Sequence, residues 1–456
     1  MQKASLEELA AQLRAGALHA ADLMADATAR YEETENRLNA YRTWAGQRAV
    51  VQAEAVDRLL ETGMDLGPMM GIPVSVKDLY GVPGLPVHAG TDTAFPEDWQ
   101  RPGPVVTRLL SQGGIVTGKT HTVEFAFGGL GTNPHCGTPL NPWSSPDAPR
   151  VPGGSSSGAG VSLAQGSALA ALGTDTAGSV RIPASFTGQT ALKVTHGRWS
   201  QEGIVPLSPS LDTPGILARS IADLAFLFTA IDGGARIAAQ DVGGLHLGVV
   251  ENTVWDEIDS AVAANTEAAI AALEAAGARV TRVQLHHADD ALDIFRRGGL
   301  AAPELRAFLD GRFPDRMARL DPAVMARVVA AEDVTASEYL QRRAALERYG
   351  RLALEVFDTV DLLVTPTVAI SAPLLADLGS PDAYRTANML ALRNTAIVNL
   401  LGWCATTLPT GLDGNGIPTG LQIIAPPRHE ERLLAASLGI EAVLGAGPDL
   451  LGPPPL

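Results

Sequence analysis

Cysteine, basic clusters and long apolar runs are all scarce in this sequence, and each shortage excludes a class of protein. Only two cysteines occur, Cys136 and Cys404, and they form no CxxC pair. They can build neither a disulfide framework nor a thiolate metal cage, so a reducing compartment is the simpler expectation.

Basic residues are in the minority along the whole chain. There are 34 Lys and Arg against 50 Asp and Glu, which gives a net charge of −16, and no basic block stands out. Nucleic-acid affinity rests largely on clustered cations that neutralise phosphates. We therefore expect no nucleic-acid partner.

No segment has the pattern of a secretion signal or a membrane span. The first residues turn acidic at Glu7 and Glu8 before any long apolar run, which a secretory signal requires. The longest apolar stretch, residues 221–231, contains Asp223 and is too short to cross a bilayer. We expect a cytoplasmic protein without membrane contact.

The composition that is present indicates one large globular domain. Hydrophobic residues make up 46% of the 456 positions, and α/β folds of this length often form one unit with insertions. Residues 1–60 read as an N-terminal helical segment, in which Leu6, Leu9 and Leu13 share one helical face. Residues 61–456 are expected to form the main domain.

Three regions of the main domain differ in composition. A core of about 67–220 is rich in Gly, Pro, Ser and Thr, with short apolar runs typical of strands between structured loops. The region of about 240–357 reads as a βαβ unit followed by helices, and about 358–440 holds the closing strands. These patterns predict a mixed α/β sheet covered by helices, with strands near 72–76, 115–117, 245–250, 279–283, 361–366, 405–408 and 419–424.

One motif competes for a nucleotide-binding function. Residues Gly113–Thr120 match GxxxxGK[ST], the pattern of a P-loop NTPase. A P-loop needs a strand before it and an open backbone that curls around phosphate, but residues 105–110 read as an amphipathic helix. The loop positions are Ile115, Val116 and Thr117, which prefer extended backbone. The P-loop reading is therefore an alternative that its context disfavours.

A second motif competes for an α/β-hydrolase function. Residues 154–158 fit the GxSxG nucleophile elbow, with Ser156 as the nucleophile. That elbow follows directly after a strand, whereas residues 146–152 contain three prolines and cannot supply a central strand. The context disfavours this reading too.

A third arrangement combines a lysine with two serine clusters. Lys77 ends an alternating strand, Ser155 follows 78 residues later in the Gly/Ser run 153–160, and Ser179 follows another 24 residues on, within 173–184. In this order and spacing the segments resemble the amidase signature family. The resemblance extends over most of the chain and includes residues 141–143, 210–215 and 416–422.

This resemblance implies a fold and an activity. The fold would be a single large domain whose mixed, mostly parallel twisted sheet is covered by helices on both faces. The activity would be hydrolysis of a carboxamide C–N bond in a small-molecule amide, with release of ammonia or an amine and with neither cofactor nor metal.

The resemblance also assigns catalytic roles. Ser179 would be the nucleophile that forms an acyl-enzyme, Ser155 the bridging serine after a cis peptide bond, and Lys77 the base, a serine–lysine variant of triad logic. Lys77 must be neutral to accept a proton, yet free lysine has a pKa of about 10.4. Burial among apolar and small residues would lower that pKa. We predict an activity that increases toward alkaline pH.

Backbone donors are expected beside the nucleophile. Small residues there let successive N–H groups turn toward the developing oxyanion. The run resembles the oxyanion hole of the family, which would consist of Thr176, Ala177, Gly178 and Ser179.

Other residues are expected to support this site. By resemblance, Asp175 and Arg181 hold the nucleophile loop through a partly buried ion pair, and Ser156 supports the same loop. Phe125 and Phe127 would line the acyl pocket, although core packing is an equally simple reading of both.

Two further clusters have weaker patterns. His88, His121 and His135 are separated by 33 and 14 residues, which match no common metal-ligand spacing, so structural histidines are expected. Cys136 follows His135 directly, and a cysteine hydrolase would need the two side chains to share a site, which sequence neighbours on a loop seldom do.

We therefore predict an amidase, with a glutamine-hydrolysing subunit of a tRNA-dependent amidotransferase as the alternative. Such a subunit would pass ammonia to a partner protein, and the acidic composition weighs mildly against it. The N-terminal helices could pair two chains into a homodimer. The pocket walls are expected from residues 120–136 and 290–345, which leave the particular amide open.

Overall fold

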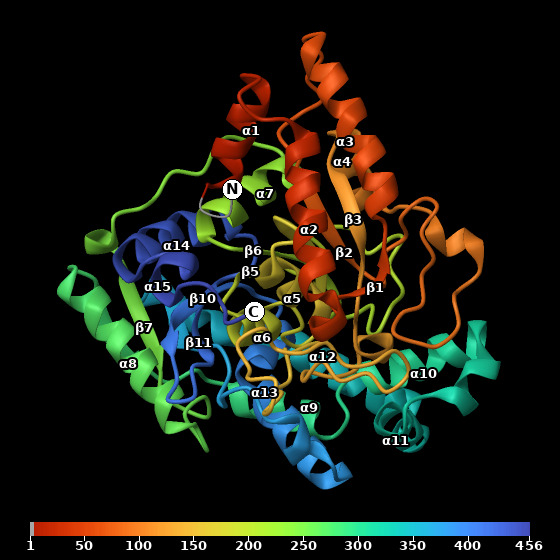
Figure 1. The fold of residues 1–456 in the computed structure, drawn as a ribbon. Coiled ribbons are helices and arrows are strands. Elements are labelled where there is room, and N and C mark those ends of the chain that lie inside the picture. The colour runs from red at the N-terminus through yellow and green to blue at the C-terminus, as the bar shows by residue number, and fades with distance from the viewer. Residues whose placement is uncertain (1–3) are drawn as a thin grey trace.

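A single mixed sheet organises the chain. The computed structural model describes residues 4–456 and folds them around 11 strands in the order β1-β3-β2-β4-β6-β5-β10-β11-β9-β7-β8 (Figure 1). The strands are β1 (Tyr41–Trp44), β2 (Pro73–Lys77), β3 (Ile115–Thr120), β4 (Ala170–Asp175), β5 (Thr190–Lys193), β6 (Thr213–Ala218), β7 (His246–Val250), β8 (Arg279–Val283), β9 (Leu362–Pro366), β10 (Cys404–Leu412) and β11 (Pro418–Ala425).

Helices flank this sheet, as the α/β prediction requires. Two of them, α5 and α6, pack on the central strands, while α8 and α14 pack on β10 and β11. The α-helices are α1 (Leu6–Arg14), α2 (Ala20–Leu38), α3 (Gly46–Glu61), α4 (Pro104–Ser111), α5 (Ser157–Gln165), α6 (Arg181–Thr187), α7 (Ile221–Asp232), α8 (Ser260–Ala275), α9 (Ala288–Arg296), α10 (Ala301–Arg312), α11 (Pro322–Ala330), α12 (Ala336–Leu352), α13 (Pro381–Leu400), α14 (Glu430–Leu444) and α15 (Gly447–Leu451).

The prediction of a mostly parallel sheet is wrong. Of the ten neighbouring strand pairs within residues 4–456, four are parallel and six are antiparallel. The apolar pattern of a buried strand says nothing about its direction, which the connections decide. The turn between β10 and β11 is short, so these two strands must run in opposite directions.

The N-terminal segment contributes to the sheet as well as to the helical layer. Between α2 and α3, the strand β1 pairs antiparallel with β3. The helical reading of this region did not include a strand, because four residues are too few to produce a clear period. Residues 1–3 lie outside the part of the chain that the structure describes.

The P-loop alternative is excluded by the position of its residues. Ile115–Thr120 forms β3, in which every residue is buried between β1 and β2. Lys119, the lysine of the pattern, is buried and forms an ion pair with Asp78 at 2.9 Å. No open loop is left there to wrap a phosphate.

One apolar segment is longer than the sequence reading recognised. Residues Glu430–Leu451 have the length and the mean hydropathy, 1.4, of a membrane span. Yet α14, which makes up most of this segment, packs on β10, β11 and α7, with Leu433, Leu434 and Ile440 buried. Such packing is typical of a core helix in a globular domain.

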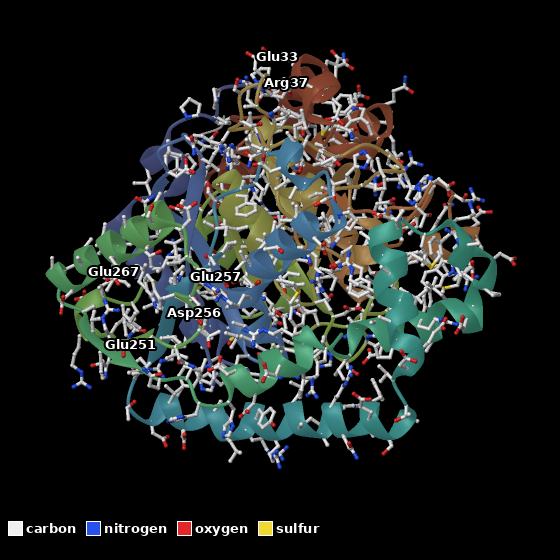
Figure 2. The ribbon with its side chains drawn as sticks, turned by 90° about the horizontal axis from the view of Figure 1, so that it is seen from below. Glu33, Arg37, Glu251, Asp256, Glu257 and Glu267 are labelled. Atoms are coloured by element: carbon white, nitrogen blue, oxygen red, sulfur yellow. The ribbon has the colours of Figure 1, made fainter. Side chains whose placement is uncertain are left out.

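Acidic side chains gather on one side of the molecule. Figure 2 shows Glu251, Asp256, Glu257 and Glu267 together over the β7–α8 side. Glu267 is paired there with Arg282 at 2.8 Å.

The parallel pairing of β2 with β4 creates the position of the candidate site. Val76 lies opposite Leu172, so both strands end at the same edge of the sheet. Lys77 is the last residue of β2 and Asp175 the last of β4. The loops that leave this edge carry the two serine clusters.

Candidate active site

Lys77 is enclosed at the end of β2. Its Nζ donates to Oγ of Ser155 at 2.7 Å and to Oγ1 of Thr174 at 2.8 Å, and its side chain has no solvent exposure. The two acceptors are hydroxyls rather than carboxylates. A lysine held in this way has no direct counterion.

Burial sets the protonation state of this lysine. Loss of solvation lowers the pKa of Lys77 to about 7, against the opposing attraction of the Asp212 and Asp175 carboxylates. Asp78, its neighbour in sequence, forms an ion pair with Lys119 instead and does not contribute to the shift in the pKa of Lys77. Near neutral pH, Lys77 is therefore half neutral and able to accept a proton.

The first serine cluster forms a tight turn ahead of α5. The Gly154–Ser155 peptide bond is cis, and Gly153 has a φ of 79°. Ser156 is the N-cap residue of α5, and its Oγ lies 3.3 Å from the carbonyl oxygen of Thr174. No strand precedes this turn, so Ser156 does not occupy a nucleophile elbow, and its side chain joins the turn to β4.

The second serine cluster is wound around the carboxylate of Asp175. Oδ1 of Asp175 accepts from the N–H of Gly178 at 2.8 Å, and Oδ2 accepts from the N–H of Val180 at 3.2 Å. The two clusters meet where the N–H of Ser156 donates to the carbonyl oxygen of Ser179 at 3.1 Å. The loop geometry around Ser179 is thus fixed by one buried acid.

Arg181 balances the charge of that acid. The Arg181–Asp175 ion pair, at 2.9 Å, is fully buried on both sides rather than partly buried as expected. The guanidinium also donates to Oδ1 of Asn399 and Oε1 of Gln422. Burial alone would raise the pKa of Asp175, but Arg181, Lys193 and Asn399 hold it down at about 2.

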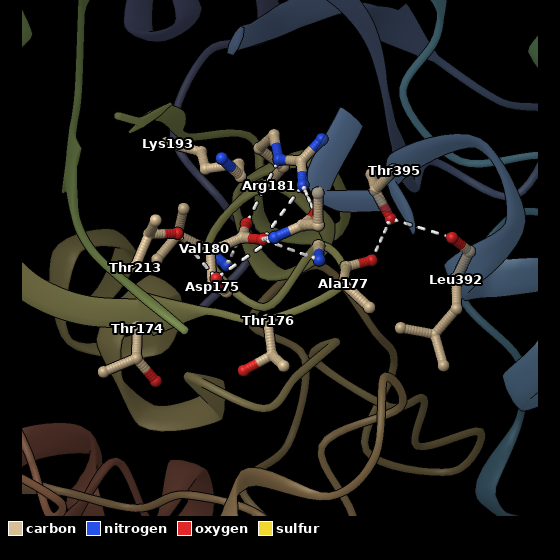
Figure 3. A network of polar contacts seen from close by, with 12 residues as sticks. Thr174, Asp175, Thr176, Ala177, Val180, Arg181, Lys193, Thr213, Leu392 and Thr395 are labelled. Carbon is tan, nitrogen blue, oxygen red and sulfur yellow. Dashed lines mark hydrogen bonds and ion pairs between the residues drawn. The ribbon is translucent and has the colours of Figure 1, made fainter. Parts of the chain in front are cut away.

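Lys193 is a further buried cation that the sequence reading missed. It lies near the ion pair in Figure 3, and its Nζ donates to the carbonyl oxygens of Val194 and Trp403. Burial and the nearby Arg181 charge lower the pKa of Lys193 to about 8. Only its contacts reveal it, because a lysine in a short strand carries no distinctive pattern.

The backbone donors beside Ser179 differ from the predicted set in one respect. The N–H of Gly178 is used by Asp175, so it is not free for a ligand. The N–H groups of Thr176, Ala177 and Ser179 have no acceptor within residues 4–456. Gly178 is needed for another reason, because its φ is 131° and a Cβ there would collide with Oγ1 of Thr395.

The hydroxyls of Ser155 and Ser179 lie in adjoining loops without a direct bond. Across the described chain, no hydrogen bond joins them, and Oγ of Ser179 has no protein partner. Catalytic hydrogen bonds are often long before substrate arrives and tighten in the complex. Ser179 itself is buried, with 3% of its surface exposed.

Asp212 adds a second buried acid behind the site. Its Oδ1 accepts from the Thr176 hydroxyl at 2.6 Å, and its Oδ2 accepts from the N–H groups of Leu207 and Ser208. Burial raises the pKa of Asp212 to about 6, and the carboxylate of Glu304 adds to the effect. A negative Asp212 in turn favours the protonated form of Lys77.

The two phenylalanines have different surroundings. Phe125 is fully buried among aromatic and aliphatic side chains that include Phe95, so it belongs to the core and does not line a pocket. Phe127 is half-buried, with the guanidinium of Arg327 above its ring at 4.5 Å. A φ of 48° at Phe125 turns the chain sharply between them, which residue spacing alone does not predict.

The histidines and the cysteine do not converge on one centre. His88 faces Asp78, the ring of His121 contacts Asn39, and His135 faces Glu124 at 3.0 Å. No group of three or more candidate metal ligands occurs in the described part of the chain. Burial raises the pKa of the Cys136 thiol, which opposes a reactive thiolate.

Comparison with known proteins gives a consistent result. A family model described as Amidase matches residues 22–434. A 2-amino-5-chloromuconic acid deaminase from Comamonas testosteroni is 60% identical over 456 residues, which cover 99% of this chain and 98% of that protein. A glutamyl-tRNA(Gln) amidotransferase subunit from Salinispora arenicola is 31% identical, with 97% of each chain covered. A solved amidase structure has a TM-score of 0.87 at 30% identity, covering 97% of this chain and 100% of its own.

The Asp175–Arg181 pair generates a prediction about stability. Asp175→Asn should lower the free energy of unfolding by about 3–5 kcal/mol, because it leaves a buried guanidinium without its carboxylate. Denaturant unfolding at pH 7 measures the loss. The matched control is Glu347→Gln, which breaks the exposed Arg343–Glu347 pair at 3.6 Å and should cost about 0–1 kcal/mol. Equal losses in the two variants would contradict the role of the buried pair.

Proposed function

Because the chain belongs to the amidase signature family and is an amidohydrolase that breaks C–N bonds of small molecules, we propose that Lys77, Ser155 and Ser179 carry out this reaction. The observation that carries the proposal is the buried contact of 2.7 Å between Nζ of Lys77 and Oγ of Ser155. A lysine that is half neutral at pH 7 and hydrogen-bonded to a serine is a ready proton acceptor.

The proposed relay passes protons from Ser179 through Ser155 to Lys77 and later returns them. Oγ of Ser179 attacks the trigonal carbon of the substrate, its proton passes to Ser155, and the proton of Ser155 passes to neutral Lys77. When the C–N bond breaks, the proton returns by the same route to the departing nitrogen. Water then releases the product from Ser179 and restores the hydroxyl.

Backbone donors would stabilise the charge that develops during the attack. The N–H groups of Thr176, Ala177 and Ser179 are the proposed oxyanion hole, without Gly178. The Asp175–Arg181 pair fixes this loop before substrate arrives, so little reorganisation is needed.

For the substrate we propose an unsaturated amino-dicarboxylic acid of the 2-aminomuconic type. The support is the 60% identity, over nearly the whole chain, to a deaminase named for such an acid. Its amino group sits on a carbon of a C=C bond, so its imine tautomer offers a trigonal carbon bonded to nitrogen, as an amide does. Addition of Ser179, loss of ammonia and addition of water would convert that imine into a ketone.

Three broader features are proposed with this function. Residues 67–220 would form the catalytic core and residues 240–357 would contribute walls of the substrate pocket. A cytoplasmic location fits the two free cysteines. Pairing of two chains through the N-terminal helices is a further proposal, which sedimentation of the purified protein can test.

The assignment of the nucleophile predicts a labelling pattern. A fluorophosphonate should label the wild type and Ser156→Ala but not Ser179→Ala, and ammonia release by Ser179→Ala should fall by at least about 10³-fold. Gel fluorescence and an ammonia assay provide the two measurements. Loss of the label in Ser156→Ala alone would instead support an elbow hydrolase.

The role of Lys77 predicts a pH profile. With a pKa of about 7, Lys77 is neutral above that value, so kcat/KM should rise about tenfold per pH unit from pH 5 toward 7 and level off above about 8. Asp212→Asn should move this limb to lower pH, since the Asp212 carboxylate raises the pKa of Lys77. A profile that is flat down to pH 5 would exclude Lys77 as the base.

The proposed substrate class predicts a ranking of substrates. Ammonia release from 2-aminomuconic acid should exceed that from glutamine by about 10²-fold or more in kcat/KM, because the chain is 60% identical to a deaminase named for such an acid. The purified single chain should suffice. Preference for glutamine, gained only with a second protein present, would favour the amidotransferase alternative, whose match at 31% identity is more distant.

A further inference from the structure

Arg327 on α11 lies at the edge of the loop that adjoins the catalytic serines. Its guanidinium carbon is 4.5 Å from the centre of the Phe127 ring, and its Nε donates to the carbonyl oxygen of Ala323 at 2.9 Å within the same helix. The guanidinium carbon thus lies over the aromatic ring, while the bond from Nε restrains the side chain. Arg327 is thus oriented before any ligand binds.

One end of this guanidinium lacks a partner. Nη2 of Arg327 is shielded from solvent and has no acceptor in the described chain, and no carboxylate within residues 4–456 forms an ion pair with it. The buried Arg181 contrasts with it, because Asp175, Asn399 and Gln422 accept from its nitrogens. A charged donor that is desolvated and unpaired is costly unless an anion occupies the place beside it.

Helix α11 is hydrogen-bonded to the loop of residues 123–129, which adjoins the Ser155 turn. The N–H of Asp321, the N-cap residue of α11, donates to Oε2 of Glu124 at 2.7 Å. Glu124 opens the short 3₁₀ helix η2 (Glu124–Ala126), directly before Phe127. This hydrogen bond holds α11, and with it Arg327, beside the loop.

The same loop is bound at both ends to the turn that carries Ser155. The N–H of Val123 donates to the carbonyl oxygen of Ser155 at 3.2 Å, and the N–H of Gly154 donates to the carbonyl oxygen of Gly129 at 2.8 Å. Phe127 lies midway between these two attachments. The guanidinium therefore lies over a residue of the loop that is hydrogen-bonded to the Ser155 turn.

Two more polar groups from α13 adjoin this loop. A Cβ placed on Gly128 would lie 2.8 Å from the hydroxyl of Tyr384, and Oδ1 of Asn388 accepts from the N–H of Gly129 at 2.7 Å. Neither the Tyr384 hydroxyl nor Nδ2 of Asn388 is hydrogen-bonded within the described chain, but neither is a buried atom without a partner, as Nη2 of Arg327 is. Together with Nη2 of Arg327, they place unused hydrogen-bond donors along Phe127–Gly129.

We propose that Arg327 is a specificity-determining residue that binds the carboxylate of the substrate remote from the C–N bond being broken. The inference rests on the proposed function, which supplies an acidic substrate. A guanidinium that is already stacked and oriented loses little freedom when it binds a carboxylate. The cation would also attract a dianionic substrate into a protein whose net charge is −16.

The test measures binding and turnover separately. Binding of muconic acid, which has the two carboxylates but no amino group, is measured by calorimetry on wild type, Arg327→Gln and Arg327→Lys. We expect Arg327→Gln to weaken binding by about 10- to 100-fold and Arg327→Lys by less, because lysine keeps the charge but not the planar fork. Arg343→Gln, at an exposed arginine of α12, is the matched control and should bind like the wild type.

Turnover distinguishes a binding role from a structural one. The kcat/KM of Arg327→Gln should fall by a similar factor on 2-aminomuconic acid but change little on its methyl ester at the distal carboxylate. Equal losses on both substrates, or unchanged muconate binding in an active enzyme, would overturn the role of Arg327 and leave the proposed function intact. If the wild type neither binds muconate nor releases ammonia from the amino acid, the substrate class itself is wrong and the inference fails with it.

Discussion

A lysine without solvent and without a direct counterion is the constraint on which this structure depends. Lys77 is held by the hydroxyls of Ser155 and Thr174, so the chain must bring the end of β2, the end of β4 and the Gly/Ser turn to one point. Burial lowers the pKa of Lys77 so that the neutral amine is populated near pH 7. Below that pH the lysine carries a charge that has lost its solvation, which is unfavourable. The parallel pairing of β2 and β4 satisfies this constraint, since both strands end at the same edge.

A second buried charge stabilises the geometry that the lysine requires. Asp175 organises the Ser179 loop through its own backbone neighbours, and Arg181 neutralises it in an ion pair while also donating to α13 and β11. Its pKa of about 2 means that the acid stays charged over the working pH range, so its stabilisation is present above about pH 4 and is lost only as the pH falls toward 2. Lys77, the proposed base, titrates near neutrality, whereas the carboxylate of Asp175 stays charged throughout that range.

The two halves of the proposed site come from different regions of the chain. The backbone donors near Ser179 and the turn before α5 come from the region 67–220, whereas Arg327 and the elements around it come from the helical region after β8. In the proposed site, the catalytic groups thus lie at the sheet edge, and the proposed carboxylate-binding arginine lies on the helical layer, where α10 and α11 are drawn below β1–β3 in Figure 1. Such a division lets one catalytic core accept different substrates when the helices change.

The sequence alone determined what local pattern and motif order can determine. The α/β class and the strands near 72–76, 245–250 and 279–283 followed from periodicity and turn residues. The family, with its proposed Lys77, Ser155 and Ser179, followed from the resemblance that the order of the lysine and the two serine clusters carries. Only the tertiary structure decided the antiparallel majority of the sheet, the use of the Gly178 N–H by Asp175, and the burial of Phe125 beside the half-exposed Phe127. The physical reason is distance along the chain: propensity acts over a few residues, whereas direction, desolvation and the meeting of Arg327 with Phe127 depend on segments far apart in sequence that only the completed fold brings together.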